Sequence, residues 1–356
     1  MKTVTTDIEG EIVMKTVLPG ILSRVFAAVV LMVVGVFNAA GAAEIEWKMH
    51  AVWGMAREEA KYLQRWTERV NARTGDRFNV KLFPGGALGI KDVDMLRVLP
   101  PGNAIQIAGF YPGYASRDIG ALAYLLPPGV VDSPDKIAAL LPELEKIYQN
   151  SYDDWGIKLI DMTVPLHSTI EIMCREPVNS LEALRTRKVR VWERHSVETF
   201  KKLGISAQII PQGDLYVAMK TGVFDCALYI ASLAKTISLQ EVAPYAAYIT
   251  PHAIQPNSII ASKKAWDALP PDIEKVLLEE VRKLNAEQAQ AFKAGTWQNQ
   301  AMKEFEEAGG KVIEPFSEAD REAFTKAALE AWKELSQEAG EKAMRNYEQV
   351  RAALEK

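Results

Sequence analysis

Alternating and helical patterns of apolar residues follow one another along the first third of the chain. Residues 45–52 (IEWKMHAV) and 77–83 (RFNVKLF) alternate apolar and polar positions, which predicts two strands. Between them, apolar residues recur every three or four positions up to Thr74-Gly75, which predicts a helix that ends there. A further helical segment and a third strand at 104–110 (AIQIAGF) follow. This β-α-β-α-β order predicts a mostly parallel sheet with helices on its faces.

A second series of the same kind runs from about residue 157 to residue 230. Strands IKLIDM, STIEIMCREPV, KVRV, SAQIIP and FDCALYI alternate with helical segments that end at Gly204 and Gly222. Beyond Pro271 the pattern changes to long helices, the last of which begin at the capping box SEAD. The sequence therefore predicts an α/β protein with two lobes and appended C-terminal helices.

Residues 14–43 have the features of a secretory leader. Lys15 and Arg24 are basic, residues 25–36 form an apolar run, and residues 40–42 (AGA) fit a small-residue cleavage site. The run is too short to cross a bilayer, and no later stretch reaches the length of a membrane-spanning helix. We expect residues 1–43 to be the signal-peptide region, with translation starting at Met14. We expect the remaining chain to be exported, soluble and not itself membrane-spanning.

Charge and cysteine content narrow the possible partners. The 356 residues carry a formal net charge of −4, so no overall basic field favours nucleic acid. Cys174 and Cys226 are the two cysteines of the chain. An oxidising compartment permits them to pair, but thiols at strand ends are more often simply buried. The sequence favours two separate buried thiols and leaves a disulfide open.

The chain lacks the short motifs of common catalytic and cofactor sites. It contains no G-x-S-x-G, H-E-x-x-H, C-x-x-C, G-x-G-x-x-G or phosphate-binding lysine loop. Its four histidines are scattered without the spacing of metal ligands. We therefore expect neither an enzyme nor a bound cofactor or metal. An exported two-lobe protein of this kind is typical of ligand binding in the cleft between lobes.

Arg190 is the strongest candidate binding residue in the sequence. It lies in the short apolar strand KVRV, where side chains alternate between faces, so Arg190 and Trp192 point the same way. A guanidinium in this position has two interpretations. It forms a structural ion pair with an acid such as Glu193 or Asp214, or it binds an anionic ligand.

Four segments, in this order along the chain, resemble the substrate-binding proteins of tripartite ATP-independent periplasmic (TRAP) transporters, the DctP-like family often described as C4-dicarboxylate-binding. They are FNVKLFPGGALG, LEALRTRKVRV, LGISAQIIPQGDLYVAMKTGVFD and WDALPPDIEKVL. The match runs from about Ile45 to the C-terminal helices. It implies a two-lobe periplasmic binding protein fold with crossing hinge strands and long C-terminal helices. Residues 44–167 with about 256–295 would form lobe I, and residues 168–255 with about 296–356 would form lobe II.

The resemblance also implies a set of ligand-binding residues. An arginine of the family's K-x-R-V strand clamps the ligand carboxylate, and Arg190 stands at the matching position. A guanidinium suits this role because its planar fork donates two parallel hydrogen bonds and stays charged when desolvated. By position, the other implied ligand-binding residues are His50, Trp53, Phe110, Tyr111, Trp192, Glu193, Gln212, Tyr229 and His252.

Two departures from the family pattern bear on the ligand. Cys226 stands where many members have glycine, and Tyr229 stands where they have an asparagine that bonds the ligand. Exchanging an amide for a phenol removes a polar anchor and adds an apolar wall. We therefore expect a monocarboxylate with an apolar or aromatic body rather than a C4-dicarboxylate. His50 or His252 would hydrogen-bond an additional oxygen.

The resemblance implies a transport function. The protein would capture a small organic carboxylate in the periplasm, close about hinges near residues 165–172 and 252–260, and deliver the ligand to a TRAP permease driven by an ion gradient. Two alternatives stay open from the sequence. One is a periplasmic sensory receptor for the same ligand class, and the other is a carboxylate-processing enzyme with Glu193 or a histidine as base.

Overall fold

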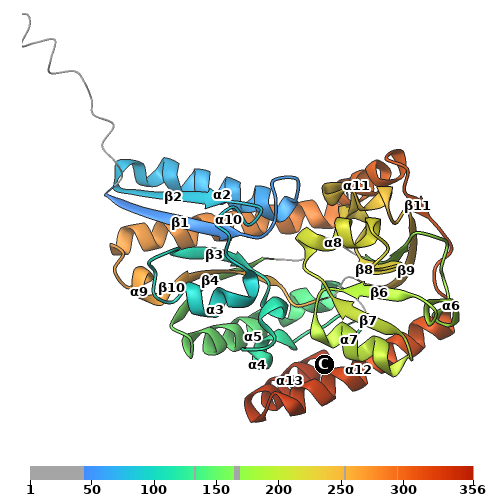
Figure 1. Cartoon of the computed structure of the whole chain (residues 1–356). Helices are drawn as coiled ribbons and strands as arrows, with labels where there is room; N and C mark the ends of the chain where they lie inside the picture. Colours follow the sequence, from blue (N-terminus) through green and yellow to red (C-terminus); the bar gives the residue numbers. More distant parts are fainter. Residues whose placement is uncertain (1–43, 132–133, 164–168, 252–253, 295, 356) are drawn as a thin grey trace, which may run out of the picture.

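Two β-sheets form the cores of two lobes (Figure 1). The computed structural model describes residues 44–131, 134–163, 169–251, 254–294 and 296–355. The predicted signal peptide lies outside these residues. The sheet of lobe I has the order β2 (Phe78–Phe83), β1 (Ile45–Ala51), β3 (Ile107–Phe110), β10 (Asn257–Ser262), β4 (Ile157–Thr163). The sheet of lobe II has the order β11 (Lys311–Val312), β9 (Tyr245–Pro251), β5 (Thr169–Cys174), β8 (Cys226–Tyr229), β6 (Lys188–Val191), β7 (Ser206–Ile209).

Both sheets are mixed, which corrects one expectation from the sequence. Strand β1 pairs in parallel with β2 and β3, and β6 pairs in parallel with β7 and β8, as β-α-β units require. Strand β10 is antiparallel to β3 and β4, and β5 is antiparallel to β8 and β9. The prediction of a mostly parallel sheet is wrong for these strands, because β10 enters lobe I after the chain has crossed from lobe II.

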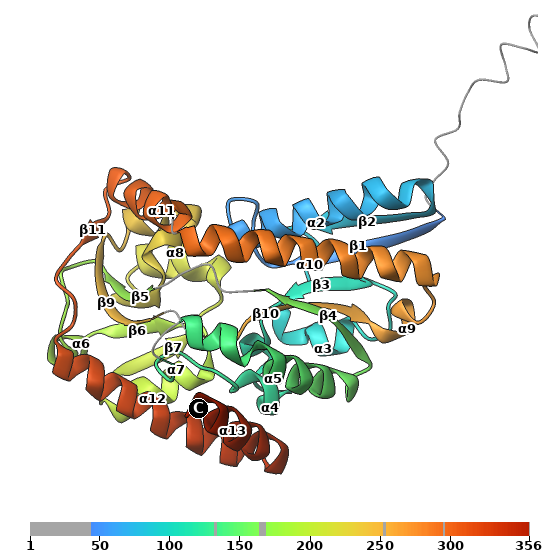
Figure 2. The same cartoon turned by 180° about the vertical axis from the view of Figure 1, so that it is seen from behind.

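The helices cover the faces of both sheets (Figures 1 and 2). The expected two-lobe α/β architecture with long C-terminal helices is confirmed. In the described residues, no helix is long and apolar enough to cross a membrane. The α-helices are α2 (Glu58–Thr74), α3 (Met95–Val98), α4 (Gly120–Ala123), α5 (Pro134–Asp153), α6 (Leu181–Leu184), α7 (Arg194–Lys202), α8 (Gln212–Lys220), α9 (Lys263–Trp266), α10 (Pro271–Ala294), α11 (Thr296–Glu307), α12 (Glu318–Glu338) and α13 (Glu341–Leu354).

Helix α10 packs against the back of lobe I and leads into lobe II. The Tyr62 hydroxyl donates to Asn285 Oδ1 at 2.8 Å, and the Trp66 indole N–H donates to the Leu277 carbonyl at 3.2 Å. Both aromatic side chains come from α2 and are buried. Figure 2 shows α10 running along the back of the molecule until α11 follows in lobe II. A single helix therefore spans the rear of the space between the lobes.

The last two helices contact both lobes. Helix α12 begins at the predicted capping box, where the Ser317 side chain accepts the Asp320 N–H at 3.1 Å. It packs against α7, with the Phe200 and Phe324 rings 5.6 Å apart. From α13, Asn346 donates to the Ala121 carbonyl of α4 at 2.8 Å. Contacts from α13 thus reach lobe I, and the division of the chain into lobes at the residues given above stays a prediction.

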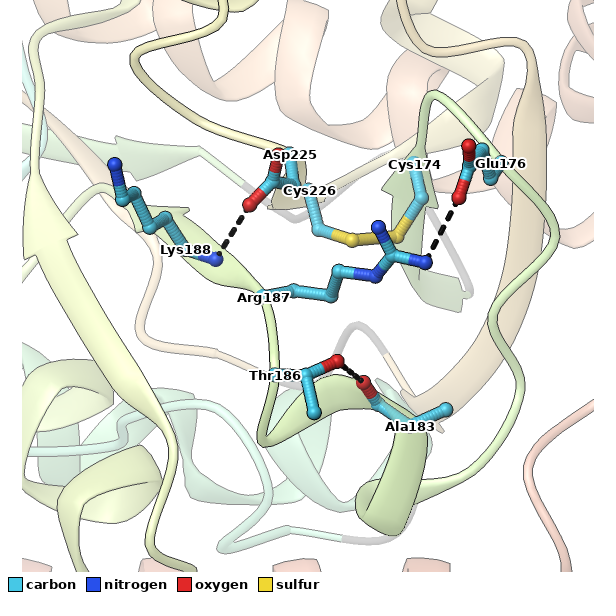
Figure 3. Close-up of a disulfide and its surroundings, with 8 residues drawn as sticks. All are labelled: Cys174, Glu176, Ala183, Thr186, Arg187, Lys188, Asp225 and Cys226. Atoms are coloured by element: carbon cyan, nitrogen blue, oxygen red, sulfur yellow. Dashed lines mark hydrogen bonds and ion pairs between the residues drawn. A yellow bond between two sulfur atoms is a disulfide. The ribbon is translucent and has the colours of Figure 1, made fainter.

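A disulfide joins two neighbouring strands of lobe II. Cys174 ends β5 and pairs directly with Cys226 at the start of β8, with their Cα atoms 4.1 Å apart and the sulfurs bonded. The preference for separate thiols is therefore wrong, because β-pairing brings together two residues that lie 52 positions apart. Figure 3 shows the bond beside Lys188, whose N–H donates to Asp225 Oδ2 at 2.9 Å. The bond thus lies beside the start of the strand that carries Arg190.

Candidate functional site

A cavity of about 960 Å³, open mouth included, lies between the lobes. Lobe I contributes the loop after β1, the end of β3 and the segment that leads into β10. Lobe II contributes the ends of β6 and β8 and the start of α8, and α10 closes part of the rear. The lining residues are Trp53, Arg57, Glu59, Tyr62, Leu63, Gly109, Tyr111, Tyr114, Thr163, Arg190, Trp192, Gln212, Tyr229, Ile230, Leu233, Ile254, Gln255, Asn257, Ser258, Ile259 and Gln288.

Aromatic and aliphatic side chains make up much of this lining. Trp53 and Tyr111 come from lobe I, and Trp192 and Tyr229 come from lobe II. Gly109 lets the wall of lobe I pack closely, because a Cβ on it would lie 2.5 Å from Leu63 Cδ1. A largely apolar surface of this kind favours the non-polar body of a ligand, while a few polar groups fix the orientation of the ligand.

Arg190 is a buried cation whose hydrogen bonds are incomplete. Its side chain is 1% exposed, and its Nε donates to the Ile210 carbonyl at 2.9 Å. Its Nη1 has no hydrogen-bond partner, and no carboxylate in the described part of the chain pairs with it. Burial lowers the pKa of Arg190 to about 10, so the guanidinium remains charged at neutral pH. A buried charge without a counter-ion is costly, and a ligand anion would supply one.

The two acids that the sequence offered as ion-pair partners do not neutralise Arg190. Glu193 receives a hydrogen bond from the Tyr111 hydroxyl at 2.9 Å, and burial raises the pKa of Glu193 to about 8. Its carboxyl group is therefore mostly neutral at pH 7. Asp214 is exposed at the start of α8. Of the two interpretations of Arg190, the geometry favours binding of an anionic ligand over a structural ion pair.

Arg57 brings a second charge to the cavity that the sequence analysis missed. It directly precedes α2, is 6% exposed, donates through Nε to Glu59 Oε2 at 3.0 Å and donates through Nη1 to Gln212 Oε1 at 3.1 Å. Burial lowers its pKa, but the Glu59 carboxylate more than offsets this and raises it above the ordinary value. The sequence did contain an indication of this role. A cation beside a helix N-terminus interacts unfavourably with the helix dipole, so Arg57 needs a compensating interaction elsewhere.

The structure brings six of the ten predicted binding residues together in the lining: Trp53, Tyr111, Arg190, Trp192, Gln212 and Tyr229. Three others are buried outside it. His50 contacts Asp92 at 3.3 Å between Nε2 and Oδ1, Phe110 lies in the core of lobe I, and Glu193 contacts Tyr111. His252 lies outside the described residues. The ligand-binding role of all ten stays a prediction.

Several polar lining residues had no sequence signal. Gln255 lies in the crossing segment just before β10, Asn257 and Ser258 begin β10, and Gln288 lies on α10. These positions reach the cavity because the chain returns from lobe II to lobe I, a feature that local periodicity does not encode. In the described residues, no group of three or more His, Cys, Asp or Glu side chains is arranged to hold a metal ion.

The charged side chains that line the cavity carry one net positive charge. Arg57 and Glu59 pair with each other, so their charges cancel. Arg190 is the remaining charged lining residue in the part of the chain that the structure describes. The cavity therefore complements a ligand with a single negative charge, surrounded by apolar walls.

Comparison with known proteins places this geometry in a family. Residues 49–338 match the model of bacterial extracellular solute-binding protein family 7 (DctP). A monocarboxylate 2-oxoacid-binding periplasmic protein of Nostoc sp. (strain PCC 7120) is 24% identical over 313 residues, which cover 83% of this chain and 80% of that protein.

Two solved structures share the fold. A TRAP periplasmic solute-binding protein from Sulfitobacter sp. NAS-14.1 with bound β-D-galacturonate has a TM-score of 0.76 and 21% identity, over 87% of this chain and 100% of the other. DctP7 of Bordetella pertussis, an extracytoplasmic solute receptor binding pyroglutamic acid, has a TM-score of 0.75 and 18% identity, over 87% and 99%.

These findings confirm the resemblance noted in the sequence. The family consists of solute-binding proteins, so the expectation that the chain is not an enzyme is also confirmed. With most of its length matched, the chain belongs to bacterial extracellular solute-binding protein family 7, the DctP family of TRAP transporter solute-binding proteins.

Proposed function

We propose that this protein is a periplasmic receptor for an organic monocarboxylate, which it holds through Arg190 in the cavity between its lobes. The observation that carries the proposal is the buried, uncompensated guanidinium of Arg190, with Nη1 free to donate. A ligand carboxylate there would gain a charge-assisted hydrogen bond from a buried guanidinium. Each hydrogen bond to a charged group contributes about 1.5–3 kcal/mol.

A monocarboxylate fits the charge of the lining better than a dicarboxylate. The second cation, Arg57, already has Glu59 as its counter-ion, so a second ligand carboxylate would find no free positive charge. Burying an unpaired carboxylate among Trp53, Tyr111 and Trp192 would be strongly unfavourable. Two of the similar proteins are described with monocarboxylate ligands, the Nostoc 2-oxoacid-binding protein and the pyroglutamate-binding receptor.

Ligand binding would favour closure of the two lobes. The cavity takes lining residues from both lobes, and Arg57 of lobe I already bonds Gln212 of lobe II. A ligand held by Arg190 that also touches lobe I makes contacts that only the closed arrangement provides, which shifts the equilibrium toward it. The closed receptor would then deliver its ligand to a TRAP permease driven by an ion gradient.

Thermal unfolding against a panel of acids tests the proposal. The panel contains pyroglutamate, 2-oxo acids, galacturonate, phenylacetate and, as dicarboxylates, succinate and malate. A ligand at 1,000 times its Kd adds about 4 kcal/mol to the free energy of unfolding, a readily measured shift. We expect shifts with monocarboxylates and none with succinate or malate. A shift confined to the dicarboxylates would contradict the charge argument.

Two arginine variants show whether Arg190 is the anchor. Arg190→Gln should weaken ligand binding at least 30-fold, because it removes one partner of a buried charge pair. The ligand-free variant should be no less stable than the native protein, since a costly buried charge is gone. Arg187→Gln is the matched control, because Arg187 directly precedes the same strand but pairs with Glu176 outside the cavity. Unchanged binding by Arg190→Gln would refute the assignment.

A further inference from the structure

A second polar side chain lines the cavity at Gln255, the last residue of the predicted lobe II, and its hydrogen bonds to Leu125 and Leu126 attach it to lobe I, opposite Arg190. Gln255 lines the cavity from the crossing segment before β10 and is 1% exposed. Its Oε1 accepts the backbone N–H groups of Leu125 and Leu126 at 3.2 and 3.4 Å. Its Nε2 has no hydrogen-bond partner in the described part of the chain.

The backbone decides which way this amide faces. Of the two terminal atoms of a side-chain amide, only the oxygen accepts hydrogen bonds, so the two backbone N–H donors fix Oε1 on the side of Leu125 and Leu126. The Nε2 group must occupy the other branch, where it offers donors and no acceptor. Such an orientation is set by the fold and not by a choice between two equivalent flips.

Gln255 is also held firmly in place. Its own N–H donates to the Leu126 carbonyl at 2.9 Å, and the Tyr148 hydroxyl donates to the Pro256 carbonyl at 2.7 Å. Two residues further on, Ser258 Oγ and the Tyr152 hydroxyl are 2.8 Å apart. A buried donor without a partner is energetically costly, and here it cannot turn toward another acceptor without breaking these bonds.

We infer that Gln255 is the subsite for a second ligand oxygen, so that the preferred ligand is a hydroxy- or oxo-monocarboxylate. This inference rests on the proposed function, because Arg190 must hold the carboxylate. The two anchors are attached to different lobes, so one ligand that reaches both links lobe II to lobe I. Gln288 adds a further unpartnered atom, Oε1, to the same lining and suits a ligand hydroxyl. From the sequence, this oxygen was expected to meet His50 or His252.

Calorimetric titration with five-carbon acids tests the subsite in the native protein. The probes are pentanoate, 2-hydroxypentanoate, 2-oxopentanoate and 4-oxopentanoate, which share size and charge and differ in the second oxygen. We expect at least one oxygenated acid to bind about tenfold or more tightly than pentanoate. Equal affinity for all four would overturn the inference and leave the proposed function standing. Absence of binding by monocarboxylates of any kind would instead overturn the proposed function.

The variant Gln255→Glu locates the effect. A glutamate keeps an oxygen for the Leu125 and Leu126 N–H groups but replaces the free donor by an acceptor. Its added charge weakens every acid anion similarly, so the readout is the affinity ratio of the best oxygenated acid to pentanoate. We expect that ratio to fall to about one. An unchanged ratio in a folded variant would overturn the assignment to Gln255. If the variant does not fold, the four native titrations decide alone.

Discussion

The Tyr111 hydroxyl donates a 2.9 Å hydrogen bond to Glu193 Oε2, which joins the end of β3 in lobe I to the end of β6 in lobe II. Both side chains are almost fully buried, and Glu193 Oε2 lies 2.7 Å from the position that a Cβ on Gly113 would occupy. The Glu193 carboxyl group therefore crosses from lobe II to lobe I and packs against Gly113, where any larger residue would clash with it. Glu193 acts between the lobes, although it does not line the cavity.

The burial of Glu193 should make stability depend on pH. Burial raises the pKa of Glu193 from its ordinary 4.5 to about 8, so the folded chain holds a proton that the unfolded chain has lost between those values. Stability from this group is complete below pH 4.5 and disappears as pH rises toward 8, at up to about 1.4 kcal/mol per pH unit. We expect Glu193→Gln to flatten the pH profile of urea unfolding in this range.

Two comparisons make that measurement specific. Glu171, whose pKa burial raises to about 7, contributes a slope of the same sign, so the variant should flatten the profile only in part. Glu198→Gln is the control, because Glu198 lies on α7 and pairs with Lys201 at the surface. Equal profiles for native protein and Glu193→Gln would contradict the buried, protonated state.

Gln212 should contribute to affinity through its bond to Arg57. The variant Gln212→Met keeps the length of the side chain but loses the acceptor for the Arg57 Nη1 donor. A hydrogen bond to a charged group contributes about 1.5–3 kcal/mol, so we expect a loss of about tenfold or more in ligand affinity by calorimetry. Gln208→Met, at an exposed position of β7, should have no effect. Similar affinities for both variants would count against a contact between lobes.

Gly109 should be intolerant of a methyl group. In Gly109→Ala the new Cβ would lie 2.5 Å from Leu63 Cδ1 and 3.1 Å from the Trp53 ring, so these two cavity-lining side chains must shift. We expect a loss of about 1–3 kcal/mol in the free energy of unfolding, with weaker ligand binding. Gly213→Ala is the control, since nothing lies within 4 Å of its Cβ position. A Gly109→Ala protein with native stability and affinity would show that this wall adapts.

The disulfide should add substantially to stability. It closes a loop over a sequence separation of 52 residues, for which loop entropy predicts about 4 kcal/mol. Chemical reduction, or the double change Cys174→Ser with Cys226→Ser, should lower the free energy of unfolding by up to that amount in urea titrations. Because Val189 pairs with Cys226 next to Arg190, ligand affinity should also fall. Full stability with both thiols verified as free would refute this role.

Local patterns were sufficient for most of the fold and for the main anchor. Alternation in KVRV placed Arg190 and Trp192 on one face, and helical spacing and caps located α2 and α12. These features depend on neighbours within a few residues, which a sequence states directly. The resemblance added the crossing hinge strands and the proposed role of the arginine.

Contacts between distant segments were decided by tertiary structure alone. No local pattern brings Gln255 and Gln288 to the cavity, pairs Cys174 with Cys226, or turns Glu193 toward Tyr111. Each of these depends on where the crossing strands and α10 place residues that lie tens to hundreds of positions apart. Burial then sets their chemistry, because among the described residues it leaves Arg190 without a carboxylate partner and the Gln255 Nε2 group without an acceptor, and it raises the pKa of Glu193 to about 8.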